Sequence, residues 1–371
     1  MKKLRIILAF LLFPLSIIYG ILVFFRNKMY DQGILKSYAF KMPLISVGNI
    51  TVGGTGKTPH IEYLADLLRE EFDLAILSRG YKRKSKGFQM VTPESDVRTS
   101  GDEPLQVKRK FPEITVAVDR KRVHGVQALR ENQSDLDLVL LDDAFQHRKI
   151  KVNLSILLID YNHPISKDFL LPLGNLREQA HEKRRANIII ITKSPPNLQP
   201  IQRRVLLKKL RPYPYQSVFF TTYQYGTPRE VFGPGDNNQI INENNNIPGG
   251  DTTVLLVTGI ANPALLKDHI EENYSSKVQT LTFPDHKFYT KRAVKKIQRH
   301  FGKIEGNKVI VTTEKDAVRF REISDFPEDL KKQMYYIPVS VKFLNNRTSD
   351  FNRQILEYVR KNKKHSFLYP G

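Results

Sequence analysis

The chain of 371 residues contains no cysteine, and this absence removes several classes of chemistry at once. It excludes disulfide bonds, thiol nucleophiles and thiolate metal sites, and it is compatible with the cytosol. Nine histidines are present, but no H-E-x-x-H sequence occurs, so the histidines predict no zinc site. Catalytic chemistry must therefore come from oxygen and nitrogen side chains and from bound cofactors.

Acidic residues are also few in comparison with basic ones. Thirty-eight Asp and Glu against 59 Lys and Arg give a formal net charge of +21. Such a charge favours binding to nucleic acid, anionic lipid headgroups or phosphorylated substrates. A nucleic-acid binder, whose affinity would fall steeply with salt, is poorly supported, because the sequence shows neither a basic module interleaved with aromatic residues nor a helix-turn-helix pattern.

A run of twenty uncharged, mainly apolar residues at positions 6–25 is close to the length of a membrane-spanning helix. Basic residues flank it on both sides, so the charge bias does not fix an orientation. A cleaved signal peptide is the alternative, but the run exceeds the usual apolar region and no A-x-A site follows it. We expect a retained membrane anchor helix over residues 1–30, which either spans the bilayer or lies in one leaflet.

Short apolar runs alternate with helix-like stretches through the first half, which is typical of parallel strands joined by crossover helices. The predicted strands there are 44–47, 74–77, 115–118, 136–141, 155–159 and 187–192, with helices or turns at 60–70, 104–110, 122–131 and 178–185. A strand at 217–225 and a Gly-, Pro- and Asn-rich connector at 233–251 follow. A second α/β unit is predicted beyond, with strands at 253–258, 278–282, 308–311 and 335–341, helices near 263–272 and 291–301, and a basic tail helix at 352–364.

Residues 48–59, GNITVGGTGKTP, lie between a predicted strand and a predicted helix, the context of a nucleotide-phosphate loop. Its glycines allow a tight bend that points backbone N–H groups at phosphate oxygens, and the helix N-terminus adds partial positive charge. Lys57 would reach the outer phosphates and the Thr58 hydroxyl would ligate magnesium. The predicted nucleotide-binding residues are Thr51, Val52, Gly53, Gly54, Thr55, Gly56, Lys57 and Thr58.

One position departs from the G-x-x-x-x-G-K-[ST] pattern, because Thr51 stands where the first glycine is expected. Either Gly48 or the Gly53-Gly54 pair must then supply the flexibility. A glycine-rich turn that only packs tightly is the structural alternative.

Two carboxylates end the apolar run at 136–143, LDLVLLDD. Ligands of parallel α/β sheets bind beyond the carboxyl ends of the strands, so Asp142 and Asp143 are expected to face the same crevice as the phosphate loop. Asp142 would hold magnesium directly or through water, and capping of the next turn is the alternative. Gln146 and His147, on the same turn, either hydrogen-bond substrate or are solvated.

Three further segments carry charged residues with two readings each. Asp102, in SGDEP at 100–104, either complements the start of a helix or accepts the proton of an attacking hydroxyl. Arg177 and Glu178, in GNLRE at 174–178, either clamp phosphate and approach the metal or form a surface ion pair. His286 beside Asp285, in FPDHKF at 283–288, either takes part in proton transfer or belongs to a structural turn, and TTEKD at 312–316 is equally ambiguous.

Taken together, these segments resemble the tetraacyldisaccharide 4′-kinase family of lipid A biosynthesis. The motifs that carry the resemblance are VGNITVGGTGKTP at 47–59, LSRGYKR at 77–83, SGDEP at 100–104, LLDDAFQHR at 140–148, LPLGNLRE at 171–178, FPDHKFYT at 283–290 and TTEKDAVRF at 312–320. The resemblance implies transfer of the γ-phosphoryl group of ATP, with Mg²⁺, to the 4′-hydroxyl of a tetraacylated glucosamine disaccharide 1-phosphate, forming lipid IVA at the cytoplasmic face of the inner membrane. It also implies an α/β fold with a phosphate-loop NTPase-like, parallel-sheet kinase domain at 31–216, a strand-like linker at 217–250 and a smaller C-terminal α/β domain at 251–371.

The resemblance also implies roles for individual residues. Lys57 and Asp102 look like the phosphate-binding lysine and the general base, with His286 as partner of the base. Pairing of Asp102 with His286 would require the two domains to close around the linker. Metal ligands are expected at Thr58, Asp142 and Glu178, and substrate contacts at Asp143, Gln146, His147 and Arg177.

The expected partners are the acylated disaccharide lipid and the anionic lipids of the inner membrane, with no nucleic acid and no obligate protein partner. The alternative function is a membrane-associated nucleotide-hydrolysing switch, which would turn over nucleotide without a lipid acceptor. Lys193 follows a predicted strand as in a guanine-reading loop, but Pro195 occupies the place of the required aspartate.

Overall fold

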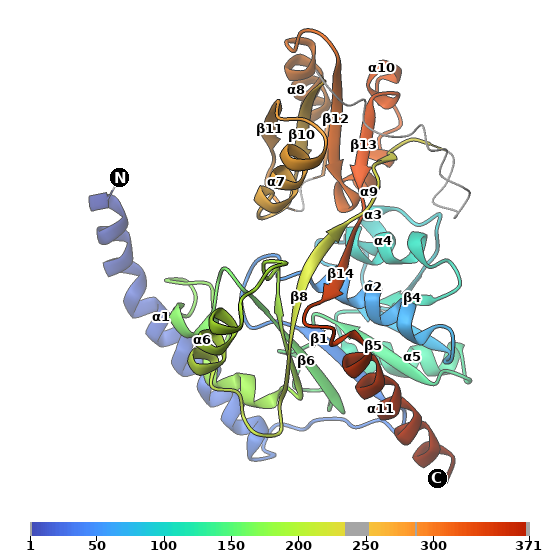
Figure 1. Ribbon diagram of the computed structural model, residues 1–371. Helices are drawn as coiled ribbons and strands as arrows, with labels where there is room; N and C mark the ends of the chain where they lie inside the picture. The colour runs from blue at the N-terminus through green and yellow to red at the C-terminus, as the bar shows by residue number, and fades with distance from the viewer. Residues whose placement is uncertain (1, 234–251, 286–287, 369–371) are drawn as a thin grey trace. The chain divides into compact units, whose positions relative to one another are not determined.

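The computed structural model describes residues 2–233, 252–285 and 288–368 (Figure 1). Contacts group the chain into two compact units. The first is made of Met1–Arg79, Ala117–Tyr223 and Val341–Gly371, and the second of Gly80–Val116 and Gln224–Ser340. Each unit has a parallel sheet and a hydrophobic core of its own.

The sheet of the first unit has β1 (Leu44–Gly48) at its centre, paired in parallel with β5 (Leu138–Asp142) on one side and with β6 (Leu154–Asp160) on the other. The strand order is β14-β8-β7-β6-β1-β5-β2-β4-β3, with β3 (Gln89–Val91) at the edge. The other strands are β2 (Leu74–Ser78), β4 (Thr115–Val118), β7 (Ile188–Thr192), β8 (Ser217–Tyr225) and β14 (Val339–Phe343). β1, β2, β5 and β7 are buried at every residue, which is why their sequences are runs of apolar residues without alternation.

Helices pack against the strands of this sheet, as is usual for a parallel arrangement. The helical elements of the first unit are α1 (Lys2–Asp31), α2 (Lys57–Leu68), α5 (Arg122–Asn132), η1 (Ile165–Lys167), η2 (Ala180–Arg185), α6 (Pro200–Leu210) and α11 (Thr348–Leu368). The segment expected as a helix at 178–185 is a 3₁₀ helix that begins at Ala180. α6 begins with a capping box between Gln199 and Gln202 and has Pro200 in its first turn, where a missing N–H costs no hydrogen bond.

In the second unit the strand order is β11-β10-β12-β13-β9, parallel except for the antiparallel edge strand β9. The strands of this sheet are β9 (Arg229–Glu230), β10 (Thr253–Thr258), β11 (Val278–Thr282), β12 (Lys308–Thr313) and β13 (Met334–Ile337). Its helices are α3 (Val97–Ser100), α4 (Asp102–Lys110), α7 (Ala264–Asn273), α8 (Lys291–Gly302), α9 (Glu314–Arg321) and α10 (Glu328–Lys331).

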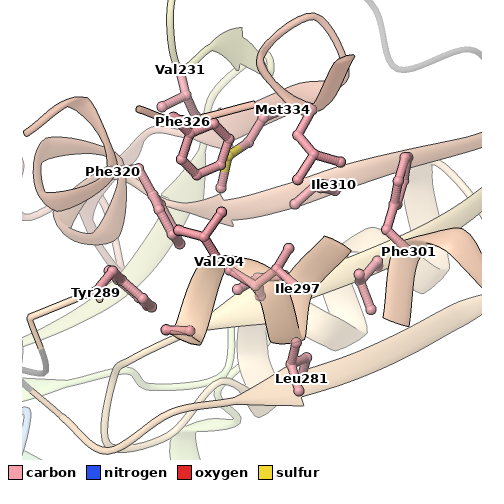
Figure 2. Packing of buried hydrophobic residues seen from close by; sticks show 14 of the residues in the cluster. Val231, Leu281, Tyr289, Val294, Ile297, Phe301, Ile310, Phe320, Phe326 and Met334 are labelled. Atoms are coloured by element: carbon pink, nitrogen blue, oxygen red, sulfur yellow. The ribbon is translucent and has the colours of Figure 1, made fainter. Parts of the chain in front are cut away.

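The core of the second unit forms where α8 lies on the sheet (Figure 2). α8 buries Ala293, Val294, Ile297 and Phe301, a helical spacing that places them on one face against Ile310 of β12. The remaining residues of this helix are mostly basic and exposed.

Two features of the fold differ from the sequence-based expectation. The strand expected at 335–341 is two strands, because Pro338 has no N–H for the ladder and separates β13 from β14. Residues 80–116, expected within the kinase domain at 31–216, group with the second unit, where α4 packs on α9. From residue 234 onward, the expected connector at 233–251 lies outside the described residues.

Within the described part of the chain, one helix segment, Leu12–Asp31 of α1, is long and apolar enough to cross a membrane. The large apolar residues exposed on it are Phe13, Leu15, Ile17, Ile18, Ile21, Leu22, Phe24 and Phe25. On the other face of the helix, Ser16 donates a hydrogen bond to the carbonyl of Leu170 (2.8 Å) and Tyr19 to that of Arg177 (2.8 Å). One face of α1 therefore contacts the first unit, and its exposed apolar surface is weak support for membrane association.

Candidate active site

The phosphate loop between β1 and α2 needs glycine at two positions. Gly53 has φ 102° and Gly56, at the start of α2, has φ 85°, in the region that residues with a Cβ avoid. Gly48 has a different role, because a Cβ there would lie 2.8 Å from the Cβ of Phe145. Of the alternatives considered from sequence, Gly53 supplies the turn and Gly48 the close packing.

Thr51 can replace the expected glycine because its backbone is paired like a short strand. It forms an antiparallel bridge with Leu176. On either side, the N–H of Val52 donates to the carbonyl of Asn175 (2.8 Å) and the N–H of Arg177 to that of Ile50 (2.8 Å). A β-branched residue suits this extended conformation, and the pairing places the GNLRE segment beside the phosphate loop.

The start of α2 gathers the groups expected to hold phosphate. α2 is twelve residues long, so its N-terminus presents unpaired N–H groups and partial positive charge to an anion. Lys57 Nζ lies 3.7 Å from Asp143 Oδ1. The buried Asn49 side chain donates to Thr55 Oγ1 (2.9 Å), which fixes the base of the loop.

The buried side chain of His60 holds the same turn through its contact with Gly56. His60 Nδ1 lies 2.7 Å from the Gly56 carbonyl, which can only accept, so this nitrogen carries the proton, while Nε2 lies 3.1 Å from Thr221 Oγ1 of β8. Burial lowers the pKa of His60 to about 4, so it is neutral at physiological pH.

Asp142 and Asp143 lie where β5 ends, as predicted. Asp142 is opposite Val47 of β1 in the sheet register and accepts a hydrogen bond from Ser78 Oγ (2.9 Å). Arg177 Nη1 lies 3.2 Å and 3.3 Å from the two carboxylate oxygens of Asp143. Burial opposes ionisation of Asp143, but the charges of Lys57 and Arg177 outweigh it and hold its pKa below the ordinary value. The structure thus brings Lys57, Asp143 and Arg177 together in one charged cluster.

Gln146 and His147 follow on the same turn. Gln146 donates from Nε2 to the Asn49 carbonyl (2.7 Å), which holds the end of β1 in place. Burial, followed by the positive charges of Arg122 and Arg79, lowers the pKa of His147 to about 4. A neutral imidazole has one donor and one acceptor nitrogen, so His147 can form hydrogen bonds with a ligand.

Glu178 is fully buried and lies between two arginines. It pairs with Arg26 of α1 (2.7 Å) and with Arg185 of η2. Glu178 therefore forms buried ion pairs instead of the surface pair considered from the sequence, and these pairs join α1 to η2. Its expected role as a metal ligand stays a prediction.

Asp102 belongs to the second unit, where it is the first residue of α4 and follows Gly101 (φ 91°). Its Oδ1 accepts the Glu103 N–H (3.0 Å), and its Oδ2 accepts hydrogen bonds from Arg319 Nε (3.0 Å) and Nη2. The carboxylate is buried and faces a cation. Asp102 therefore lies at the start of a helix, as one of the two sequence-based readings expected, and its carboxylate also pairs with Arg319.

Lys315 lies among the carboxylates of the same unit. Its Nζ is 2.9 Å from Glu103, 3.7 Å from Asp285 and 3.9 Å from Asp102. His286, predicted to partner Asp102, lies outside the described residues. Asp102 and Asp285 belong to one unit, and the expected pairing of Asp102 with His286 through domain closure stays a prediction.

Sequence reasoning missed two groups of residues. Asp316 and Arg319 in TTEKDAVRF contact each other three residues apart on α9, and their i, i+3 spacing after a strand was the available signal. Lys193, weighed only as part of a base-reading loop, donates from Nζ to the Gly54 carbonyl of the phosphate loop and pairs with Asp160 (2.7 Å). Nothing in the sequence indicated this contact.

Of the three residues expected to hold magnesium, Glu178 is paired with Arg26 and Arg185, while Thr58 lies in the first turn of α2 and Asp142 at the end of β5. Both offer oxygen donors, and Mg²⁺ usually takes only one or two protein ligands, its shell being completed by phosphate and water. The donor set at the end of β5 therefore fits a phosphate-bound magnesium ion.

Comparison with known proteins gives a consistent result. A family model described as tetraacyldisaccharide-1-P 4′-kinase matches residues 8–360. The tetraacyldisaccharide 4′-kinase of Bacteroides thetaiotaomicron is 45% identical over 360 residues, covering 96% of this chain and 94% of that protein. That of Phocaeicola vulgatus is 46% identical over 358 residues, covering 96% of each.

A solved structure agrees with these relatives. The crystal structure of LpxK from Aquifex aeolicus in complex with ATP is 28% identical and has a TM-score of 0.71, covering 94% of this chain and 99% of that one. The predicted phosphate-loop α/β fold is thereby confirmed. On the match of family model, relatives and fold, this chain belongs to the tetraacyldisaccharide-1-P 4′-kinase family.

Proposed function

We propose that this chain transfers the γ-phosphoryl group of ATP to the 4′-hydroxyl of a tetraacyldisaccharide 1-phosphate, a step of lipid A biosynthesis. The observation that carries the proposal is the phosphate loop followed by Lys57, with Lys57 and Arg177 each within 4 Å of Asp143 in one cluster. Membership of the kinase family over nearly the whole chain supports the same acceptor.

ATP is expected to bind through residues 51–58, with the N–H groups of the turn and the start of α2 directed at its phosphates. Lys57 then contacts the outer phosphates, and Arg177 offers a planar fork for phosphate oxygens. Thr58 and Asp142 would hold magnesium, which when bound neutralises the charge of the phosphates. Phosphoryl transfer depends mainly on such positioning and charge neutralisation.

Asp102 is proposed as the general base. It takes the proton of the 4′-hydroxyl while that oxygen forms its bond to the γ-phosphorus, and the bond from phosphorus to the bridging oxygen breaks, releasing ADP. Lys57 and Arg177 compensate the charge that develops on the transferred group. Asp143 keeps these two cations in place, and His147 and Gln146 contribute hydrogen bonds at the same strand end.

Membrane attachment is proposed to bring this chemistry to a lipid substrate. The exposed apolar face of α1 would lie in the inner membrane, with the two units on the cytoplasmic side, where ATP is available. The net charge of +21 suits the anionic leaflet and the 1-phosphate of the substrate. We propose no nucleic acid and no obligate protein partner.

The test is incubation of the purified full chain with ATP, magnesium and the disaccharide lipid in detergent micelles, followed by mass spectrometry of the lipid. We expect the lipid to gain one phosphate at the 4′ position. Asp102→Asn should lower kcat by about 10²–10⁴-fold, as expected for loss of a general base, while ATP binding persists. ADP release at the same rate without lipid would instead favour a nucleotide-hydrolysing switch.

A further inference from the structure

Arg319 lies at the centre of a buried chain of polar contacts in the second unit. Its Nε and Nη2 donate to Asp102 and its Nη1 donates to Asp316 (2.8 Å), so the guanidinium joins two carboxylates. The side chain of Arg319 is 3% exposed and that of Asp316 is fully buried. Burial opposes the charged form of Arg319, but Asp102 and Asp316 outweigh it and raise the pKa. The arginine is therefore fixed as a cation.

Asp316 in turn is held by the N-cap residue of its own helix and by groups from two other segments. It accepts hydrogen bonds from the Gly259 N–H (2.9 Å), from Thr313 Oγ1 (2.7 Å) and from the hydroxyl of Tyr289 (3.0 Å). Tyr289 also stacks on Phe320, with ring centroids 4.0 Å apart, in the hydrophobic core (Figure 2). These contacts hold Asp316 in the core of the second unit, and Asp316 in turn holds Arg319.

The network occupies the place where a doubly wound sheet usually binds its ligand. β10 connects through α7 to β11 on one side, while β12 pairs on the other side, so the strand order reverses between β10 and β12. Ligands of such sheets bind in the crevice outside the carboxyl ends of these two strands. Gly259 follows β10, Asp316 follows β12, and the hydrogen bond between them closes that crevice. Arg319 therefore contacts Asp102 at the position where a sheet of this kind usually binds its ligand.

We propose that Arg319 is a positioning residue that holds Asp102 ionised and correctly oriented for proton transfer, with Asp316 as the anchor of the guanidinium. The proposal rests on the proposed function of Asp102 as the general base. The guanidinium donates twice to Oδ2 while the Glu103 N–H donates to Oδ1, so both carboxylate oxygens are held, and the positive charge favours the deprotonated form. A base must be deprotonated and directed before the hydroxyl proton can be taken.

A structural role is the competing explanation, because an ion pair between α4 and α9 also joins two helices. The two explanations differ in what they predict for a second arginine of the same helix. Arg321 donates from Nε to the carbonyl of Val231 (2.6 Å) and its guanidinium lies over the ring of Tyr336 (5.6 Å), so these contacts join α9 to Val231 and Tyr336 of the same unit. Arg321→Met is therefore the matched control for Arg319→Met.

The experiment measures steady-state kinetics of the full chain with ATP, magnesium and tetraacyldisaccharide 1-phosphate for Arg319→Met, Arg319→Lys, Asp102→Asn, the double variant and Arg321→Met. Arg319→Met should lower kcat by about 10²-fold with KM for ATP within about twofold. In the Asp102→Asn background the same change should cost no more than about twofold, since the arginine acts through Asp102. Arg319→Lys, which keeps charge but loses the fork, should recover about tenfold.

Several results would overturn the proposal. Normal kcat in Arg319→Met would do so, as would equal losses in Arg319→Met and Arg321→Met, or losses that multiply in the double variant. If Arg319→Met does not fold, Arg319→Lys and Asp316→Asn decide, because full kcat in a folded Asp316→Asn contradicts the anchoring step. Normal turnover by Asp102→Asn would remove the proposed base itself, a result distinct from failure of Arg319 alone.

Discussion

The carboxyl ends of the two parallel sheets carry charged clusters that differ in how they are closed. At the end of β5 in the first unit, Asp143 and Arg177 keep 26% and 28% of their side-chain surface exposed. Beside β12 in the second unit, Asp316 and Arg319 keep 0% and 3%. Both clusters pair arginine with aspartate, yet the first remains open to solvent and the second is sealed.

The difference in exposure indicates different roles: the first cluster can bind a ligand, whereas the second holds a protein residue in place. In the open cluster, phosphate oxygens can replace water. Lys57 and Arg177 lie near Asp143 and can still bind an anion. A sealed cluster has its charges met by protein groups, so removing one partner leaves an uncompensated buried charge. We therefore expect substitutions in the first cluster to lower activity and substitutions in the second to lower stability as well.

The largest effect is expected from Asp316→Asn, which removes one charge of the sealed cluster. Breaking a buried ion pair in this way costs about 3–5 kcal/mol of unfolding free energy. Asp143→Asn is the matched change in the open cluster, where asparagine also tolerates the positive φ of 47°. Its cost should stay below about 1 kcal/mol, because the pair is partly solvated. Denaturant unfolding of both variants checks the contrast, and equal costs would contradict it.

Lys57→Met should have the next largest effect, on activity alone. Loss of one preorganised charge at the transferred phosphoryl group lowers kcat/KM by about 10²–10³-fold. The control is Arg69→Met at the other end of α2, where the arginine is exposed and pairs with Asp66 (2.8 Å). Steady-state kinetics with the unfolding midpoint as a second readout test this prediction. Lys57→Met with normal kcat/KM would show that the open cluster does not act on phosphate.

The open cluster was largely predictable from the sequence, and the sealed one was not. Asp142 and Asp143 directly follow an apolar strand, and residues 48–59 fit a local pattern, so short-range order alone indicated their position. Asp102 and Arg319 are 217 residues apart, and their contact depends on α4 packing against α9. The segment that carries Asp102 reads as one more crossover of the first sheet, which is why residues 80–116 were expected in the kinase domain.

Glu178 illustrates the same limit. Its neighbour Arg177 reaches the site as the motif predicts, but Glu178 turns to Arg26, which lies 152 residues earlier. The apolar run of α1 predicted a helix and gave no indication that its basic end would pair with a buried carboxylate. Strands buried on both faces were recovered within one to two residues, since continuous apolar runs define them.

His60 allows a test of the phosphate loop at acidic pH, because it is a buried titratable group that contacts Gly56 of this loop. Its pKa in the folded chain is about 4, against 6.5 for an ordinary histidine. Below pH 6.5 the unfolded chain binds more protons than the folded one, so stability falls as the pH falls from 6.5 towards 4. At pH 5 this contribution amounts to about 2 kcal/mol.

His60→Asn should remove this loss, since asparagine can still donate to the Gly56 carbonyl but does not titrate. Denaturant unfolding at pH 7.5 and pH 5 is the measurement, with His163→Asn as the control because that side chain is 66% exposed. An identical pH dependence in wild type and His60→Asn would show that burial does not keep His60 neutral.

The smallest effect is expected from Lys193→Met, which tests whether the open cluster depends on support from the next strand end. Lys193 adopts φ 53°, a strain that any residue with a Cβ shares, so the substitution changes only the contacts of its ammonium group with Gly54 and Asp160. Losing a charge-assisted hydrogen bond to the phosphate loop should raise KM for ATP about tenfold and leave kcat within about threefold. Lys208→Met on the exposed face of α6 is the control. If KM for ATP stays unchanged while the unfolding midpoint falls, Lys193 stabilises the first unit without shaping its phosphate loop.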